Sequence, residues 1–347
     1  MVEVTIQPGK LLTKEGAHRV RLGAHARSRL SVRRLQVALG LAWLLDGALQ
    51  FQPYMYKPGA NGFLGPVTQN AMGPPNLLTD FISTVVTFMV AHQVLATTGI
   101  GVVQLAIGAG LCWRRSARAA LALSVVWALG VWVIGEAVGQ LIFPQASMLT
   151  GSPGAALVYF LLGLVLWPRS RSRPDLVGPS SVADEGLLGG IGARAAWAVI
   201  WCGTSLLELE RVNHAPNAIS AQLANAAVGE PAPLAWLGRG AAQLTHGVGT
   251  EVALVLLLVE LVVGWAILRE PSRKFALGLG IVASVVFWVL GQDLGAILTG
   301  QGTDPNLGLP MLILALALWP RGGRTAGERA LVSGVTGHIP TGHIRRE

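Results

Sequence analysis

Long apolar segments alternate with polar, Gly- and Pro-rich segments along this chain of 347 residues. A helix needs about 20 apolar residues to cross the ~30 Å hydrocarbon layer of a membrane, where it satisfies its own backbone hydrogen bonds. Eight segments are candidates, near residues 34–52, 95–113, 119–142, 154–167, 194–209, 250–268, 275–298 and 307–319. The pattern therefore predicts an all-α fold with eight transmembrane helices. The fourth and eighth spans are short, so we expect each to begin inside the preceding Gly/Pro loop.

The second half of the chain repeats the first. Residues 166–169 and 318–321 both read Leu-Trp-Pro-Arg, and Trp43 aligns with Trp201. Other matched positions are Gln50 with Glu208, Gln104 with Glu260, Trp132 with Trp288, Gly139 with Gly295 and Pro153 with Pro305. The offset drifts only in loops, which tolerate insertions. Because each half has an even number of spans, we expect two four-helix repeats of parallel orientation about an axis along the membrane normal.

The repeats set the domain boundaries. We expect a basic cytoplasmic tail at 1–32, a first repeat at 33–169, a cytoplasmic linker at 170–193, a second repeat at 194–321 and a disordered cytoplasmic tail at 322–347. The long external loops at 53–94 and 210–249 each contain a helix-like piece, at 77–95 and 234–246. We predict that both pieces are interfacial or partly re-entrant helices.

Composition and charge agree with a membrane protein. Hydrophobic residues make up 52% of the chain and charged residues 13%, outside the usual range of soluble domains. Of the 26 Lys and Arg residues, 23 lie at the two ends or in loops on one predicted side, and the exceptions are Lys57, Arg211 and Arg239. Positive charge marks the cytoplasmic side, so both termini are predicted to be cytoplasmic. The formal net charge of +8 thus reports topology and does not indicate nucleic-acid binding.

Polar side chains inside the predicted spans are the first functional candidates, because burying one costs about 2.5–3.5 kcal/mol at the helix centre. They are Asp46, Gln104, Glu136, Glu208, Glu260 and Asp293. Gln104 and Glu260 each precede a glycine by four residues, a spacing that suits either helix packing or a liganding or proton-carrying group. Glu136 and Asp293 lie beside glycines near the external ends of their spans. They could line a polar cavity under the external loops, or reach the interface by themselves.

The histidines and aromatic residues give weaker signals. His92, His214 and His246 are predicted at the external face, but their spacing matches no common metal or haem motif. The two cysteines form no CxxC motif. Trp132 and Trp288 lie deeper in their spans, where packing and a flat ligand such as a quinone are the competing interpretations. We assign no catalytic residue and no metal ligand.

In each half the polar-x3-Gly span runs into a basic turn, through Arg114-Arg115 in the first and Arg269 to Arg273-Lys274 in the second. This arrangement resembles the four-helix DoxX-like family of bacterial membrane proteins, occurring here twice, over 33–169 and 194–321. The segments 43–47, 50–53 and 302–305 are similar to tandem-repeat membrane proteins of high-GC Gram-positive bacteria. The resemblance implies the bacterial inner membrane and an association with membrane oxidoreductases, as a quinone-side or anchoring subunit.

These observations favour a non-catalytic integral membrane subunit or anchor that assists a membrane or peripheral oxidoreductase and binds a quinone or lipid between its halves. The alternative is a transporter of small solutes or ions that uses Glu136, Asp293 and Glu260 along a polar path. An enzyme acting at the external face through its histidines is the third hypothesis, and no obvious nucleophile or metal supports it.

Overall fold

The computed structural model describes residues 30–70, 77–141, 143–169 and 181–321. Helices are the regular elements throughout these segments, apart from one isolated bridge between Pro168 and Gly186, so the all-α fold is confirmed for them. The described residues from Leu30 to Trp319 belong to one compact unit. Most of the predicted N-terminal tail, the linker residues 170–180 and the predicted disordered tail at 322–347 lie outside the described residues.

The helices follow the apolar pattern. Those at the predicted spans are α2 (Val32–Leu49), α5 (Gln93–Cys112), α6 (Ala117–Gly130), α7 (Ala155–Val165), α8 (Gly189–Ser205), α11 (Gly249–Ala266), α12 (Arg273–Leu290) and α13 (Gly308–Leu318). The two long loops contain the predicted helices α4 (Leu77–Ala91) and α10 (Ala232–Leu244), and also α3 (Leu64–Asn70) and α9 (Ala218–Ala226), which the pattern did not predict. Short helical turns lie at Pro53–Tyr56, Gly59–Asn61, Met148–Thr150, Ala183–Glu185, Leu206–Leu209, Asp293–Gly295 and Ile297–Thr299.

Four helices in the described segments are long and apolar enough to cross a membrane. They are α5, α6 with its π-helical extension to Gly135, α11 and α12. Only 28–39% of each apolar stretch is buried inside the protein. Large side chains such as Val126, Leu258 and Val282 therefore face outward, with 71%, 59% and 59% of their surface exposed. A continuous apolar exterior of this kind suits lipid contact and indicates a membrane protein.

The other predicted spans differ from these four in length or charge. α2 carries Arg33, Arg34 and Asp46, and α8 has 17 residues. α7 and α13 have 11 residues each, about 16 Å of helix at 1.5 Å per residue. We expected both short helices to begin inside the preceding Gly/Pro loops, but they begin after these loops, at Ala155 and Gly308.

The third and seventh helices end earlier than predicted, and this is the main correction to the sequence analysis. The helices were expected to reach residues 142 and 298, but helical structure stops at Gly135 and Leu290. Residues 137–140 and 293–296 all have positive φ, which reverses the chain direction. Gly139 and Gly295 allow this reversal, because a Cβ there would lie 1.8 Å from the Pro153 carbonyl oxygen and 2.1 Å from the Asp304 carbonyl oxygen.

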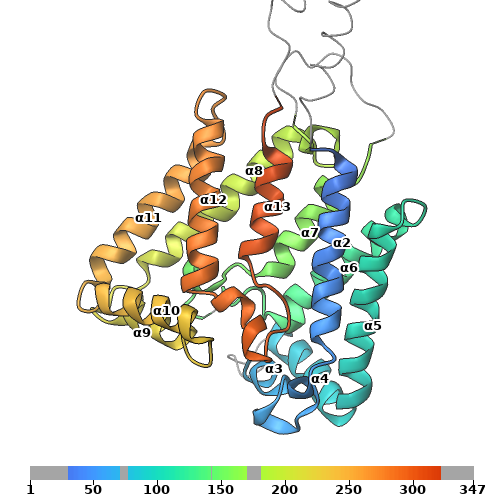
Figure 1. The fold of residues 1–347 in the computed structure, drawn as a ribbon, viewed down its shortest axis with the longest axis horizontal. Helices are drawn as coiled ribbons and strands as arrows, with labels where there is room; N and C mark the ends of the chain where they lie inside the picture. Colours follow the sequence, from blue (N-terminus) through green and yellow to red (C-terminus); the bar gives the residue numbers. More distant parts are fainter. Residues whose placement is uncertain (1–29, 71–76, 142, 170–180, 322–347) are drawn as a thin grey trace, which may run out of the picture. The chain divides into compact units, whose positions relative to one another are not determined.

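The long helices pack in pairs. α2 packs on α5 and α8 on α11, while α6 packs on α7 and α12 on α13. Glycines permit these contacts: a Cβ on Gly108 would lie 2.7 Å from the carbonyl oxygen of Gly40, and one on Gly264 would lie 2.9 Å from the amide nitrogen of Cys202. The short helices α7 and α13 contact each other in the middle of the bundle (Figure 1). The loops that precede α7 and α13 therefore lead into the interior of the bundle.

Candidate functional site

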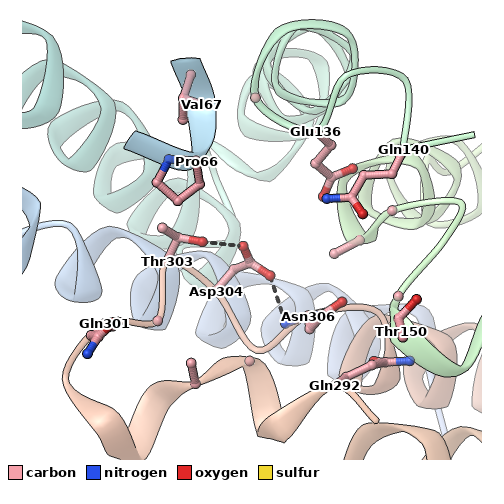
Figure 2. Close-up of a pocket in the computed structure, with 18 of the residues that line it drawn as sticks. Pro66, Val67, Glu136, Gln140, Thr150, Gln292, Gln301, Thr303, Asp304 and Asn306 are labelled. Atoms are coloured by element: carbon pink, nitrogen blue, oxygen red, sulfur yellow. Dashed lines mark hydrogen bonds between the residues drawn. The ribbon is translucent and has the colours of Figure 1, made fainter. Parts of the chain in front are cut away.

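A cavity of about 360 Å³ lies where these upstream loops meet the ends of α6 and α12. One wall is apolar and comes from the loop after α2 and from α3, with Phe63, Pro66 and Val67. The facing walls are polar and come from residues 135–155 and 292–306. Figure 2 shows the Glu136 and Gln140 side chains on one side of the cavity and Thr303 and Asp304 on another. The cavity therefore joins segments that lie about 150 residues apart in the chain.

Glu136 lies directly after the π-helical end of α6. Its Oε1 accepts a hydrogen bond of 3.0 Å from the backbone N–H of Ala156, in the first turn of α7. Its Oε2 is buried and has no hydrogen-bond partner among the described residues. Burial, and secondarily the charge of Asp304, raises the pKa of this carboxyl to about 8. Glu136 is therefore largely protonated at neutral pH, and its carboxyl can donate a hydrogen bond.

Asp304 is the second acid of the cavity. Its Oδ2 accepts a hydrogen bond from the Thr303 hydroxyl (2.8 Å) and its Oδ1 accepts one from the Asn306 N–H (2.7 Å). Burial raises the pKa of the Asp304 carboxyl above its usual range. Asp304 was not among the candidates predicted from the sequence, because it lies in a loop outside the predicted spans. The available signal was the match of Pro305 with Pro153, which sets Asp304 opposite a serine.

Asp46 lies next to this acidic pair, on the inner side of α2. Only 1% of its surface is exposed, and its Oδ1 accepts a hydrogen bond of 3.3 Å from the Tyr159 hydroxyl of α7. The Tyr159 ring in turn packs on Trp43, with 4.6 Å between ring centroids. Asp46 lies within electrostatic range of both Asp304 and Glu136. Of the predicted intramembrane candidates, Glu136 thus lines the cavity, whereas Asp46 is buried in the bundle within electrostatic range of it.

Gln292 lines the same cavity from the end of α12. Its Oε1 accepts a hydrogen bond of 3.0 Å from the Gly308 N–H, in the first turn of α13, and its Nε2 donates to the Met148 carbonyl at 3.1 Å. Gln292 therefore uses both ends of its amide and ties two loops to one helix end.

Glu208 and Glu260 form a separate buried pair away from the cavity wall. Both are 0% exposed. Glu208 accepts a hydrogen bond of 2.5 Å from the Ser147 hydroxyl, while Glu260 has no hydrogen-bond donor within normal geometry among the described residues. Gln104 is also buried, at 6% exposed, and its Oε1 has no partner in the described part of the chain. The structure thus keeps these three candidates inside the bundle.

Asp293 lies past the end of α12, outside the helix in which it was predicted. It is not among the residues that line the cavity. Burial, together with the neighbouring carboxyl of Glu230, raises the pKa of Asp293 to about 8. Asp293 and Glu136 therefore occupy different environments.

The three candidate histidines do not come together. His92 and His246 are exposed and His214 is half-buried. The His92 ring packs on Phe88 of α4, with 4.8 Å between ring centroids. Within the described segments no group of three or more His, Cys, Asp or Glu side chains has the spacing of a metal site, and Cys112 and Cys202 are free thiols.

The geometry as a whole gives a candidate binding site: a partly apolar cavity with two carboxyls, surrounded by amide and hydroxyl groups. No family model, no curated protein and no solved structure matches this chain. Its function is therefore inferred from its own residues and their contacts.

Proposed function

We propose that the chain is a DoxX-like protein of the bacterial inner membrane that crosses the bilayer eight times as two related four-helix halves. We further propose that it binds a ligand in the cavity without transforming it. The cavity carries this proposal, because its walls combine segments of both halves and present a carboxyl oxygen, Glu136 Oε2, that has no hydrogen-bond partner within the described segments.

Matched hydrogen bonds support the two-repeat architecture. Glu136 accepts from the first turn of α7, and Gln292 accepts from the first turn of α13, each at 3.0 Å. Trp132 donates its indole N–H to the Pro153 carbonyl at 2.8 Å, and Trp288 donates to the Pro305 carbonyl at 2.6 Å. The tryptophans and prolines were aligned from the sequence, and they make the same bond in both halves.

Contacts between the halves are also reciprocal. Gln50, after α2, donates a hydrogen bond to the Thr303 carbonyl of the second half at 3.3 Å. Glu208, after α8, accepts from the Ser147 hydroxyl of the first half. In each half, a residue after the first helix thus forms a hydrogen bond to a loop of the other half. A twofold arrangement requires such reciprocal contacts.

The charge distribution supports an external position for the cavity. The basic turns at Arg114 and Arg269 follow α5 and α11, at the opposite ends of these helices from the long loops. The cavity is lined by one long loop and by the turns after α6 and α12. Since basic turns mark the cytoplasmic side, the cavity opens toward the external side and both termini are cytoplasmic.

The lining selects an amphipathic ligand. Pro66 and Val67 offer an apolar wall, while protonated Glu136 offers a hydrogen-bond donor and Asp304 lines the cavity with a second carboxyl. This combination suits the polar head of a membrane-soluble molecule such as a quinone or a lipid. In this proposal the protein acts as a ligand-carrying subunit beside a membrane oxidoreductase, and its own residues supply binding groups.

Native mass spectrometry of protein purified from its own membrane tests this function. We expect wild type to carry one small lipid-soluble molecule per chain, and Glu136→Ala or Asp304→Ala to lower its occupancy about tenfold, as loss of one hydrogen bond to a polarised group would. Glu251→Ala removes an exposed carboxyl of α11 and is the control. A ligand-free wild type, or equal occupancy in all variants, would refute the binding proposal. A redox enzyme at equal stoichiometry would support the subunit role, and its absence would count against that role.

One observation favours transport as the second candidate. Asp46 and Tyr159 extend the polar groups from the cavity wall into the bundle between α2 and α7. Transport requires water access along this line from both sides of the membrane. Cysteine substitutions around Glu136 and Asp46 should then react with impermeant thiol reagents from either side. Reaction from the external side alone would exclude a transport path.

A further inference from the structure

Glu208 and Glu260 are fully buried acids with few hydrogen-bond partners. Neither is exposed at all, and three of their four carboxyl oxygens lack a partner among the described residues. α11 packs on α8 and on the turn Leu206–Leu209, and the two carboxyls lie within electrostatic range of each other. An unpaired ionised carboxyl is strongly unfavourable in such surroundings, so each group must be neutralised or paired.

The Ser147 hydroxyl distinguishes the two acids. It accepts a hydrogen bond from the N–H of Leu149, so its proton is directed to Glu208 Oε1, at 2.5 Å. This hydrogen bond favours the ionised form of Glu208, whereas burial raises the pKa of the carboxyl to about 7. Glu260 receives no comparable bond from the described residues. The Thr204 hydroxyl lies close to Glu260, and the Ile200 carbonyl at 2.9 Å and the Trp201 carbonyl at 3.1 Å can accept its proton, so that its oxygen can face a cation.

When Glu208 is ionised, charge balance requires one positive charge. With Glu208 ionised and Glu260 protonated, the pair carries a charge of −1. No Lys or Arg of the described segments is among the groups that act on either carboxyl. The oxygens that remain, from two carboxyls and the Thr204 hydroxyl, are hard ligands of the kind that small alkali and alkaline-earth ions prefer.

We propose that Glu208 and Glu260, with the Thr204 hydroxyl, bind a single monovalent cation of the size and ligand preference of Na⁺ between α8 and α11. The site is distinct from the cavity, so its test does not depend on the cavity ligand. The first half offers an internal comparison: Gln50 and Gln104 occupy the aligned positions and are buried amides. The first half therefore accommodates an amide pair at the equivalent positions, and the two carboxyls of the second half differ from amides in charge and not in size.

The experiment compares thermal unfolding of the purified full chain in NaCl and in N-methyl-D-glucamine chloride at equal ionic strength, followed by tryptophan fluorescence. We expect Na⁺ to raise the Tm by about 5 °C, saturably, because it binds only the folded state. Glu260→Gln and Glu208→Gln, which recreate the amides of the first half, should abolish the rise. Glu251→Gln on the exposed face of α11 should retain it.

Equilibrium dialysis with radioactive Na⁺ gives an independent measurement of stoichiometry. One ion per wild-type chain and none in Glu260→Gln would support the site. If either glutamine variant fails to fold, Ser147→Ala replaces it in the test, and we expect this variant to bind Na⁺ more weakly than wild type. Equal Tm values in the two salts, an equal Na⁺ response in the glutamine variants, or a saturable response to Ca²⁺ alone would each overturn the proposal. The first of these results would mean that both carboxyls are protonated.

Discussion

Replacing Glu136 by Gln should remove a pH dependence from the stability of the folded protein. The substitution keeps the shape of the protonated carboxyl, and Gln292 already demonstrates that an amide can accept the N–H of a following helix at 3.0 Å. The amide introduced by Glu136→Gln cannot ionise, so the variant lacks the titration that burial imposes on Glu136. We therefore expect it to fold normally and to diverge from wild type as pH rises above 4.5, where the unfolded wild-type chain loses this proton and the folded protein keeps it.

The size and sign of this effect follow from the pKa of about 8, against an ordinary value of 4.5. The folded protein holds the Glu136 proton more tightly than the unfolded chain does. This contribution to stability is complete below pH 4.5, declines as pH rises, and is gone above pH 8. Its upper limit is about 5 kcal/mol, at about 1.4 kcal/mol for each factor of ten in proton affinity. Between pH 6 and pH 9 the linkage relation gives a loss of about 3 kcal/mol.

Thermal unfolding in detergent at pH 6, 7, 8 and 9 measures this difference. The Tm of wild type should fall relative to that of Glu136→Gln by about 5–10 °C across this range, taking ~2–4 °C per kcal/mol. The difference between the two proteins removes the contributions of Asp304 and of the other acids. Glu251→Gln, which removes an exposed carboxyl, should run parallel to wild type. If Glu136→Gln also ran parallel to wild type, the carboxyl would not be protonated in the folded state and the reasoning would fail.

Three further outcomes are expected. Gly154→Ala should destabilise the protein by more than about 3 kcal/mol in the same unfolding assay, because the new Cβ would lie 2.0 Å from Glu136 Oε2 and the backbone φ is +97°. Gly130→Ala is the control and should be tolerated, because a Cβ at Gly130 would have no neighbour within 4 Å. Trp132→Phe and Trp288→Phe should each lower the free energy of unfolding by about 1–3 kcal/mol, because each leaves one proline carbonyl without its hydrogen-bond donor. The two decreases should be similar. The affinity for a neutral ligand with hydrogen-bond acceptors should fall above pH 8 in fluorescence titrations, as Glu136 loses its proton.

Hydropathy predicted the helices well because lipid and the protein core both select long apolar segments. It failed after Gly135 and Leu290, where apolar residues such as Val138, Ile297 and Leu298 continue the apolar pattern past interspersed glycines and polar residues. The apolar pattern alone does not separate such a segment from helix. The reversal depends on positive φ at residues 137–140 and on the close fit of Gly139 against the Pro153 carbonyl, which are tertiary contacts.

The sequence predicted two of the acidic residues at or near the candidate site, but not the contacts that bring its segments together. Asp46 and Glu136 were selected because charge is costly in a membrane, and both prove to be buried near one cavity. Their neighbour Asp304 belongs to a loop, and loop acids are ordinarily solvated. Its role depends on Gln50 and Gln52, which hold the Thr303 and Gly302 carbonyls across 253 and 250 residues of sequence. The spacing of neighbouring residues along the chain cannot predict contacts between residues that are so far apart in sequence.

Differences between the aligned positions of the two halves identify the residues that packing alone does not require. The second half has carboxyls at Glu208 and Glu260 where the first has amides, and the first half has Glu136 where the second has Gln292. At each position the amide is accommodated in the buried environment of its own half, so it would serve the fold at lower electrostatic cost. Three carboxyls have nevertheless been retained where they raise the energy of the folded state. That cost is accounted for if Glu136 serves the cavity ligand and the buried pair serves a cation.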